Sequence, residues 1–365
     1  MNQLRSKFML ACCASFIAVA ASATATDTVN VYNWSDYIAK DTVSNFEKQT
    51  GVHVRYDVFD TDETLQAKLL SGSTGYDVVV PSSTFMAKQI EAGVYEKLDK
   101  SKLPNLSHLD PLLMKIVASM DPRNTYGVPY AWGTTGLGVN MTKLKKLLGT
   151  DTVPETYDLL FKPEVVSKLN CGISMLDSPT DVFPIVLKYL GRDPNSKNPT
   201  DYQAGLEVLK KIRPYVTQFS SSGYINDLAN ADICMALGYS GDAIIARHRA
   251  LEAHRSYELR YITPAGNIPV WFDMMGIPKG APHMEAAYKW INYVLTPEVS
   301  ASITNEVFYP SANADAKKFV KPELVAEPQI YPSEAELKAM YVEMPVSPDL
   351  ARLMHRLWVE YKNGR

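Results

Sequence analysis

The chain has 365 residues, a hydrophobic fraction of 46% and a formal net charge of −3. This length exceeds one compact core and suits two domains of ordinary size. No basic run or stripe is present, so the sequence lacks the charge pattern that is typical of nucleic-acid-binding proteins. After the N-terminal segment, no stretch approaches the roughly 18 apolar residues of a transmembrane helix.

The first 25 residues have the pattern of a secretion signal. Arg5 and Lys7 give a positive start, an apolar run follows over 8–21, and an Ala-x-Ala end suits signal peptidase. The run is too short to span a membrane, and the alternative is a buried N-terminal helix. We predict a cleaved signal peptide over 1–25, an exported periplasmic protein, and a mature net charge of −3 − 2 = −5.

Two cysteines remain after cleavage, Cys171 and Cys234. An oxidising compartment and an even count favour a disulfide, and the alternative is two buried free thiols. Neither a Cys-x-x-Cys pair nor a Cys/His zinc spacing occurs, so we expect no metal and no cofactor.

The remaining sequence alternates between strand and helix patterns from residue 29 onward. Strands are predicted over 29–32, 52–58, 77–81, 171–176, 233–237, 259–262 and 271–277. Helices are predicted over 41–50, 61–70, 82–92, 182–190, 199–212, 242–253 and 284–294, with 333–363 mostly helical. This alternation predicts an α/β fold with a mainly parallel sheet. Because there is no low-complexity linker, we expect ordered strands to join the two domains.

Ligands of open α/β sheets bind outside the carboxyl ends of the strands. The segments at these ends are 33–37, 81–84, 177–181, 238–242 and 271–273. Aromatic and carboxylate side chains recur in them, and none contains Arg or Lys. Carboxylates make strong charge-assisted hydrogen bonds to protonated amines, and aromatic rings add cation–π attraction of about 0.5–2 kcal/mol. The mixture therefore indicates a polyamine, a methylene chain between ammonium groups.

Each of these residues also has a purely structural interpretation. A Trp at a strand end is commonly core, and an Asp before a helix is commonly an N-cap. Asp242 is a candidate cap, and we assign Asp41 and Asp62 to capping. A different small cation or an amino acid is an alternative ligand. An amino acid needs a cationic partner, but Arg247 and Arg249 are expected to face solvent.

An enzyme is a weaker interpretation of the sequence. The Gly-x-Ser-x-Gly elbow, the His-Glu-x-x-His helix, the P-loop and the Gly-x-Gly-x-x-Gly fingerprint are all missing from the sequence. The six histidines lie near no candidate site, and we interpret them as surface residues. We therefore expect a binding protein with no catalytic residue.

Several motifs carry a resemblance to a known family. They are Tyr-Asn-Trp-Ser-Asp-Tyr at 32–37, Tyr-Asp-Val-Val-Val-Pro-Ser at 76–82, Val-Pro-Tyr-Ala-Trp at 128–132, Asn-Asp-Leu-Ala-Asn at 226–230 and Asn-Tyr-Val-Leu-Thr-Pro at 292–297. Together they resemble the periplasmic putrescine/spermidine-binding proteins of bacterial ABC transporters, from residue 29 to the C-terminus. The resemblance implies a type II periplasmic binding protein fold, with two α/β lobes joined by crossing strands around a ligand cleft. It places one lobe at 27–137 and 260–308 and the other at 138–259 and 309–365.

The resemblance also implies a set of ligand-binding residues. The family's aromatic box falls on Trp34, Tyr37, Trp271 and Tyr309, its amine-binding acids fall on Asp36, Asp181, Asp242 and Asp273, and its polar contacts fall on Ser82 and Ser221. Ser35, Tyr239 and Glu343 complete the expected site. The disulfide of putrescine-type members falls on Cys171 and Cys234.

Departures from the putrescine type concern the ligand's length. Tyr239 stands where putrescine-type members carry Trp, and Asp181 stands where they carry Glu. Trp271 is the residue of spermidine-preferring members, and Glu343 adds an acid that could receive another amine. We expect spermidine to be preferred over putrescine, with Asp36 and Glu343 serving one end of the ligand.

The expected partners are the polyamine and the membrane subunits of an ABC importer. The protein is expected to be a monomer, and a sensing role is the alternative to transport.

Overall fold

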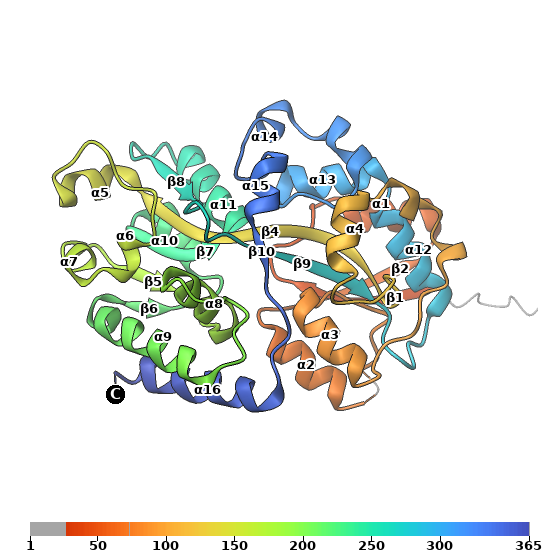
Figure 1. The fold of residues 1–365 in the computed structure, drawn as a ribbon. Coiled ribbons are helices and arrows are strands. Elements are labelled where there is room, and N and C mark those ends of the chain that lie inside the picture. The colour runs from red at the N-terminus through yellow and green to blue at the C-terminus, as the bar shows by residue number, and fades with distance from the viewer. Residues whose placement is uncertain (1–26, 73, 365) are drawn as a thin grey trace, which may run out of the picture.

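The computed structural model describes residues 27–72 and 74–364, and the expected signal peptide lies outside these ranges. Two groups of helices and strands lie side by side, with long strands running between them (Figure 1). Within the described ranges, no helix combines the length and the apolar character needed to cross a membrane.

The strands form one continuous hydrogen-bonded sheet that extends through both groups. They are β1 (Thr28–Trp34), β2 (His53–Phe59), β3 (Val78–Val79), β4 (Gly127–Asn140), β5 (Ile173–Met175), β6 (Gln218–Phe219), β7 (Met235–Tyr239), β8 (Leu259–Ile262), β9 (Pro269–Gly276) and β10 (Tyr341–Val342). The order is β2-β1-β3-β9-β4-β7-β5-β6, with β10 on β9 and β8 on β4.

The sheet is mixed, whereas the sequence predicted a mainly parallel one. Parallel pairing holds at both outer parts, in β2-β1-β3 and in β7-β5-β6. The pairs of β4 with β9, β7 and β8, and of β3 with β9, are antiparallel. The antiparallel pairs involve the two strands that join the halves, and the sequence pattern carried no signal for their direction.

Helices cover the sheet on both sides. The α-helices are α1 (Thr42–Thr50), α2 (Asp62–Leu70), α3 (Ser83–Glu91), α4 (Pro111–Val117), α5 (Met141–Leu148), α6 (Asp158–Phe161), α7 (Pro163–Val166), α8 (Pro179–Tyr189), α9 (Pro199–Ile212), α10 (Tyr224–Asn230), α11 (Ser240–Glu252), α12 (Met284–Val294), α13 (Pro297–Val307), α14 (Pro322–Val325), α15 (Glu334–Ala339) and α16 (Pro348–Lys362). Each helix in the list of sequence predictions has a counterpart among these.

Side-chain caps fix where several helices begin. Thr61 accepts a hydrogen bond from the Thr64 amide at 3.2 Å, and Ser82 and Ser178 cap α3 and α8 in the same way. Such caps satisfy amides that have no partner inside the helix. Gly51 ends α1 with φ of 70°, a left-handed conformation that favours glycine.

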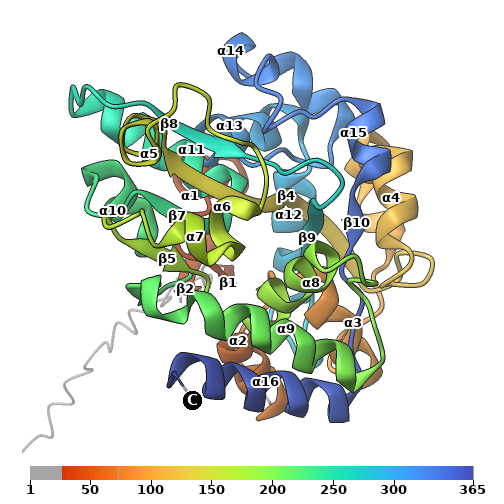
Figure 2. The ribbon, with the colours of Figure 1, turned by 60° about the vertical axis from the view of Figure 1, so that its left-hand side comes forward.

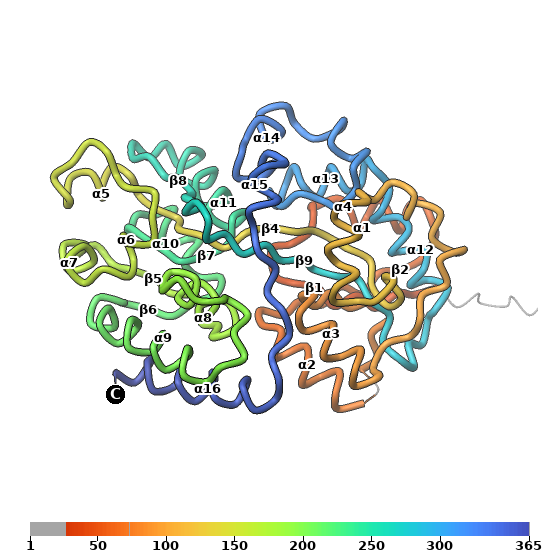
Figure 3. Tube along the Cα trace, viewed as in Figure 1, coloured from red at the N-terminus to blue at the C-terminus, as the bar shows by residue number. Residues whose placement is uncertain are grey.

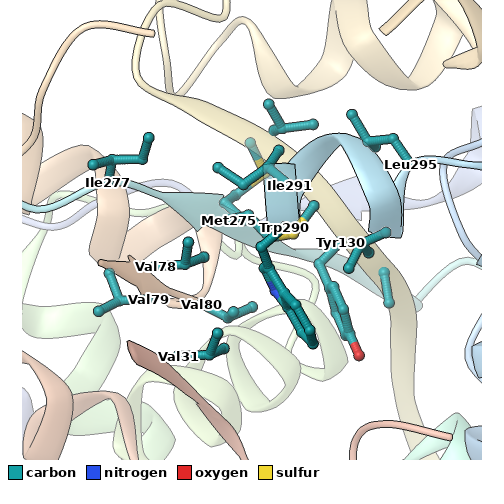
Figure 4. Close-up of a cluster of buried hydrophobic side chains, with 14 of the residues drawn as sticks. Val31, Val78, Val79, Val80, Tyr130, Met275, Ile277, Trp290, Ile291 and Leu295 are labelled. Atoms are coloured by element: carbon teal, nitrogen blue, oxygen red, sulfur yellow. The ribbon is translucent and has the colours of Figure 1, made fainter. Parts of the chain in front are cut away.

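Each group of elements has its own hydrophobic core. In the first, Val31 and Val79 of the strands and Met275 of β9 pack near Trp290 and Ile291 of α12 (Figure 4). All five side chains are 2% exposed or less. Their near-continuous apolar runs suit a sheet covered on both faces.

The second core lies around β5 and β7 and includes part of β4. Leu137 and Val139 of β4 pack in this core with Phe183 of α8 and Trp358 of α16. Figure 2 shows α16 running alongside α9, so the C-terminal helix closes one side of this half. A smaller third cluster joins α11, α13 and the segment around α14.

Strand β4 belongs to both cores, because Val128 and Trp132 lie in the first and Leu137 lies in the second. All 14 of its residues are buried. A further segment, residues 340–347, runs between α15 and α16 and adds β10 to the edge of β9 (Figure 3). We call it the C-terminal strap. Ordered strands therefore join the two lobes, as predicted from the sequence.

The exact division into lobes stays a proposal. We propose 27–137 with 260–308 for the first lobe and 138–259 with 309–365 for the second. Tyr309 is the first residue of the segment 309–365, which we assign to the second lobe, but its side chain packs in the first core. Tyr309 therefore contacts both lobes.

A disulfide joins Cys171 and Cys234, whose Cα atoms lie 5.5 Å apart. The two residues are 63 positions apart in the chain. In the chain-entropy model, closing a loop of this length stabilises the folded state by about 4 kcal/mol. The bond ties the start of β5 to the start of β7 in the second lobe.

Candidate functional site

A cavity lies between the two lobes and contains all thirteen residues that the sequence predicted for the site. Its lining is Trp34, Ser35, Asp36, Tyr37, Phe59, Asp60, Thr61, Asp62, Glu63, Ser82, Thr84, Phe85, Asp177, Ser178, Thr180, Asp181, Ser221, Ser222, Ile225, Tyr239, Asp242, Trp271, Asp273, Tyr309 and Glu343. Nine of these residues are acidic and seven are aromatic. The lining contains no Lys, Arg or His among the described residues.

The first turns of four helices supply part of this lining. They are the N-terminal turns of α2, α3, α8 and α11. Helix N-termini carry partial positive charge and favour anions. Here the first turns of α2, α8 and α11 hold Asp62, Asp181 and Asp242. The partial positive charge of the helix ends stabilises these carboxylates. Because of the carboxylates, the cavity presents negative rather than positive charge to a ligand.

Aromatic rings form a connected wall. Tyr37 lies 5.2 Å from Tyr309, which lies 5.3 Å from Trp271, which lies 5.5 Å from Tyr239 (centroid distances). A Cβ at Gly133 would lie 2.5 Å from Cζ2 of Trp271 and 3.0 Å from Cδ1 of Tyr309. The close approach of the Trp271 and Tyr309 rings to β4 therefore requires glycine at this position.

Asp242 is held by two tyrosines from different parts of the chain. Tyr309 Oη donates to its Oδ1 and Tyr224 Oη donates to its Oδ2, both at 2.7 Å. Burial raises the pKa of Asp242 to about 6, because the two tyrosine hydrogen bonds offset only part of the desolvation. The N-cap position of α11 is Tyr239, so Asp242 is not the cap of this helix.

Asp273 lies on β9, where it forms an isolated bridge with Ser82. It is 5% exposed, and burial raises its pKa well above the usual carboxyl range. Tyr37 lies beside it and lowers this pKa in part, while Asp62 and Asp181 raise it further. The protein alone therefore offsets only part of the cost of burying the ionised Asp273 carboxylate.

Asp181 lies on α8 and accepts a hydrogen bond from Tyr239 Oη at 3.3 Å. Burial raises its pKa to about 6. Ser178 caps the helix, and its Oγ accepts from the Asp181 amide at 3.4 Å. Asp181 thus contributes charge to the cavity without being the cap of its own helix.

Glu343 reaches the cavity from the C-terminal strap, one residue after β10. It is 8% exposed, and its Oε1 has no hydrogen-bond partner among the described residues. Burial raises its pKa well above the usual range, and the charge of Asp181 raises it further. An unpartnered buried carboxyl oxygen is costly for the folded protein and suits a cationic ligand.

Asp36 lies at the rim of the cavity. Its side chain is 71% exposed and its φ is 53°, so the backbone is left-handed at this point. Its Oδ2 lies 3.9 Å from Arg249 Nη2 on α11. Arg247, which we expected to face solvent, instead pairs with Glu327 at 2.6 Å and is largely covered. Neither arginine lines the cavity.

Asp62 was predicted from the sequence to be a helix cap, and this prediction is wrong. The cap of α2 is Thr61, and Asp62 is the first helical residue, 9% exposed and facing the cavity. Its Oδ1 accepts from the Ser82 amide at 3.0 Å. Burial raises its pKa to about 7. The signal in the sequence was ambiguous, because Thr61 and Asp62 are both favoured cap residues.

A cleft between two α/β lobes, lined by both and free of basic residues in its described lining, is the arrangement of a protein that closes over a small ligand. Residues 41–332 match the family of bacterial extracellular solute-binding proteins. The chain belongs to this family. The expectation of a binding protein rather than an enzyme is confirmed by this membership.

Several relatives cover almost the whole chain. The putrescine-binding periplasmic protein SpuD of Pseudomonas aeruginosa is 47% identical over 353 residues, 96% of each chain. The putrescine-binding periplasmic protein PotF of Escherichia coli is 46% identical over 352 residues, 96% of this chain and 95% of the relative. A solved structure from Listeria monocytogenes, described as a spermidine/putrescine ABC transporter, has a TM-score of 0.82 and 32% identity, and covers 93% of this chain and 100% of that one. The resemblance inferred from the sequence motifs is confirmed.

Proposed function

We propose that this protein captures a linear polyamine in the periplasm and delivers it to the membrane subunits of an ABC importer. The observation that carries the proposal is the cavity lining, with nine acidic, seven aromatic and no basic residues within the described chain. The carboxylate of an amino acid or of another anionic ligand would have no cationic partner among these residues. The names of the relatives SpuD and PotF support a polyamine.

The proposed contacts divide by chemistry. Asp273, Asp242 and Asp181 accept hydrogen bonds from ammonium groups, and Trp34 and Trp271 pack on the methylene chain. Trp34 also packs on Phe59 at 4.5 Å between centroids, and this contact holds its ring in place. Residues of both lobes touch the ligand, so binding favours the closed arrangement. Scattering of the purified protein should show compaction when polyamine is added, and unchanged dimensions would contradict closure.

Within this class we propose spermidine as the preferred ligand. Glu343 adds a buried carboxyl beyond the three that a diamine would engage, and its free oxygen suits a further ammonium group. Putrescine is the second candidate, favoured by the names of the two relatives that share nearly half of the sequence. Calorimetric titration with putrescine, cadaverine, spermidine and spermine separates the two. Tighter binding of putrescine would overturn the spermidine preference, and binding of none would overturn the polyamine proposal.

Transport rather than sensing is tested in cells. Deleting the gene should abolish uptake of labelled spermidine, and a signal-peptide-free copy should fail to restore it. Normal uptake in the deletion strain would favour the sensing role. Chromatography with light scattering tests the expectation of a monomer.

A further inference from the structure

The acids of the cavity fall into two unequal groups. Asp62 and Asp273 meet at Ser82, whose amide donates to Asp62 Oδ1 and which forms the bridge with Asp273. Burial raises the pKa of Asp62, Asp273 and Glu343, and the charge of Asp181 raises each pKa further, so Asp181 lies near all three. Asp242 instead lies near Asp36 and Arg249. This grouping differs from the expectation that Asp36 and Glu343 serve the same end of the ligand. One end holds the buried Asp62, Asp273 and Glu343 together with the half-buried Asp181. The other end holds the half-buried Asp242 and the rim acid Asp36, with Arg249 outside the lining.

Three segments of the chain build the larger group. Asp62 comes from α2 of the first lobe, Asp181 comes from α8 of the second, and Glu343 comes from the C-terminal strap. Asp62 is not needed as a cap, because Thr61 caps the helix. Its Oδ1 accepts from the Ser82 amide at 3.0 Å, and this bond fixes the carboxyl at the cavity wall. An independent feature of this end is the buried Oε1 of Glu343, which has no partner among the described residues.

Charge balance decides what this end can accept. A diamine places one ammonium group at each end of a cavity. One ammonium against these four carboxyls leaves most of them either protonated or uncompensated, and both states reduce the energy gained on binding. A second positive charge at the same end compensates more of them.

We propose that Asp62, with Asp181 and Glu343, forms a subsite for a second ammonium group, which makes the cavity selective for ligands with three or more amines. This inference rests on the proposed polyamine function. Lys88 is a cation of the protein itself that could take the place of the ligand's ammonium group, because burial lowers its pKa but the charge of Asp62 raises it in part. Lys88 does not line the main cavity but lines a smaller neighbouring one, to which Glu343 also contributes.

The test is the ratio of spermidine to putrescine affinity in Asp62→Asn, measured by calorimetry. Asparagine keeps an oxygen for the Ser82 amide and removes the charge. Spermidine affinity should fall by at least about tenfold, because a charge-assisted hydrogen bond is lost, while putrescine affinity falls by less than about threefold. The ratio should therefore fall. Equal losses for the two ligands, or an unchanged ratio, would overturn the subsite.

Glu91→Gln is the control, because Glu91 is exposed at the end of α3, carries the same charge and does not line the cavity. It should leave the ratio unchanged. Glu343→Gln should lower the ratio as Asp62→Asn does, so the inference remains testable if one variant is poorly folded. A wild-type protein that binds neither amine contradicts the proposed function itself. Binding of both amines with a ratio that neither variant changes contradicts only the subsite.

Discussion

Two regions of this protein bury acids in opposite ways. In the first lobe, Asp77 is 0% exposed and its carboxylate is fully engaged. The amide and side chain of Asn30 donate to Oδ2 at 2.7 and 3.1 Å, the His283 amide donates to Oδ1 at 2.6 Å, and His283 Nδ1 lies 3.0 Å from Oδ2. In the cavity, Glu343 is almost as buried and has an oxygen without a partner among the described residues.

The difference separates a structural acid from a binding acid. The protein itself supplies the hydrogen-bond donors for Asp77, which joins β1 to α12. For the cavity acids it supplies only part of the compensation, and burial raises the pKa of Asp181 and Asp242 to about 6 and of Asp62 to about 7. Removing an acid should therefore have opposite effects on the free energy of unfolding in the two regions.

The largest expected effect is on ligand binding in Asp273→Asn. An ammonium group that enters this buried site without its carboxylate loses about 3–5 kcal/mol, or at least a hundredfold in affinity. The ligand-free variant should unfold at the same or a higher temperature, because a poorly compensated carboxyl has gone. Calorimetry and thermal unfolding measure the two quantities. Near-normal affinity for spermidine would remove Asp273 from the site.

Asp77→Asn should show the reverse. The amide cannot accept from all the donors around it, so the free energy of unfolding should fall by about 2–3 kcal/mol. Affinity of the folded protein for spermidine should stay within about twofold, since Asp77 does not line the cavity. Denaturant titration and calorimetry of the same preparation test this. If Asp77→Asn were stable but bound spermidine more weakly, the distinction between structural and binding acids would be contradicted.

The stability of the ligand-free protein should also depend on pH through the cavity acids. Their folded pKa values lie above the unfolded value of about 3.8, so the folded state binds more protons between about pH 4 and pH 7. Stability should therefore fall as pH rises from 5 to 8, by about 1–2 kcal/mol for a carboxyl with a pKa near 6. Affinity for the cationic ligand should rise over the same range.

Comparison with Asp181→Asn measures how much of the pH dependence of stability comes from Asp181. This variant should show a shallower fall of melting temperature between pH 5 and 8 than the unmodified protein. Parallel curves for the two proteins would show that Asp181 titrates as it does in the unfolded chain.

The smallest effect concerns the aromatic wall. In Gly133→Ala, the new Cβ would displace Trp271 and Tyr309, and affinity should fall by about 1 kcal/mol through lost ring contacts. Gly138→Ala in the same strand is the matched control, because its Cβ would meet Leu228 in the second core at 2.9 Å. It should lower the melting temperature and leave affinity unchanged. Equal affinities for the two variants would show that the packing of the rings does not set ligand binding.

Much of the fold was predictable because its periodicity is local. The strand at 259–262 and the helices at 199–212 and 284–294 were predicted with the bounds that the structure has. Strand β4 was not predicted, although its Val-Pro-Tyr-Ala-Trp motif was noted. It is buried along its whole length and contains Pro129 and four glycines, which normally indicate turns. The packing of rings against glycines such as Gly133 explains this composition, and no local pattern reveals such long-range contacts.

The site was predictable to the extent that its residues share a type and a position after strands. All thirteen predicted residues line one cavity. Asp62 was missed because a cap and a buried first-turn acid look alike in sequence. The role of His283 was also missed, since it meets Asp77 from 206 positions away and we had placed it at the surface. Contacts of this separation depend on the completed fold.

The route of the chain through the two lobes has a practical consequence. Strand β4 carries it from one core to the other, β9 brings it back, and the C-terminal strap takes it across again before α16. A single proteolytic nick in a surface loop therefore cannot release one lobe from the other. Production of either lobe as an independent fragment requires a circular permutation or several separate pieces. Limited digestion should accordingly yield a nicked protein that stays assembled and still binds its ligand.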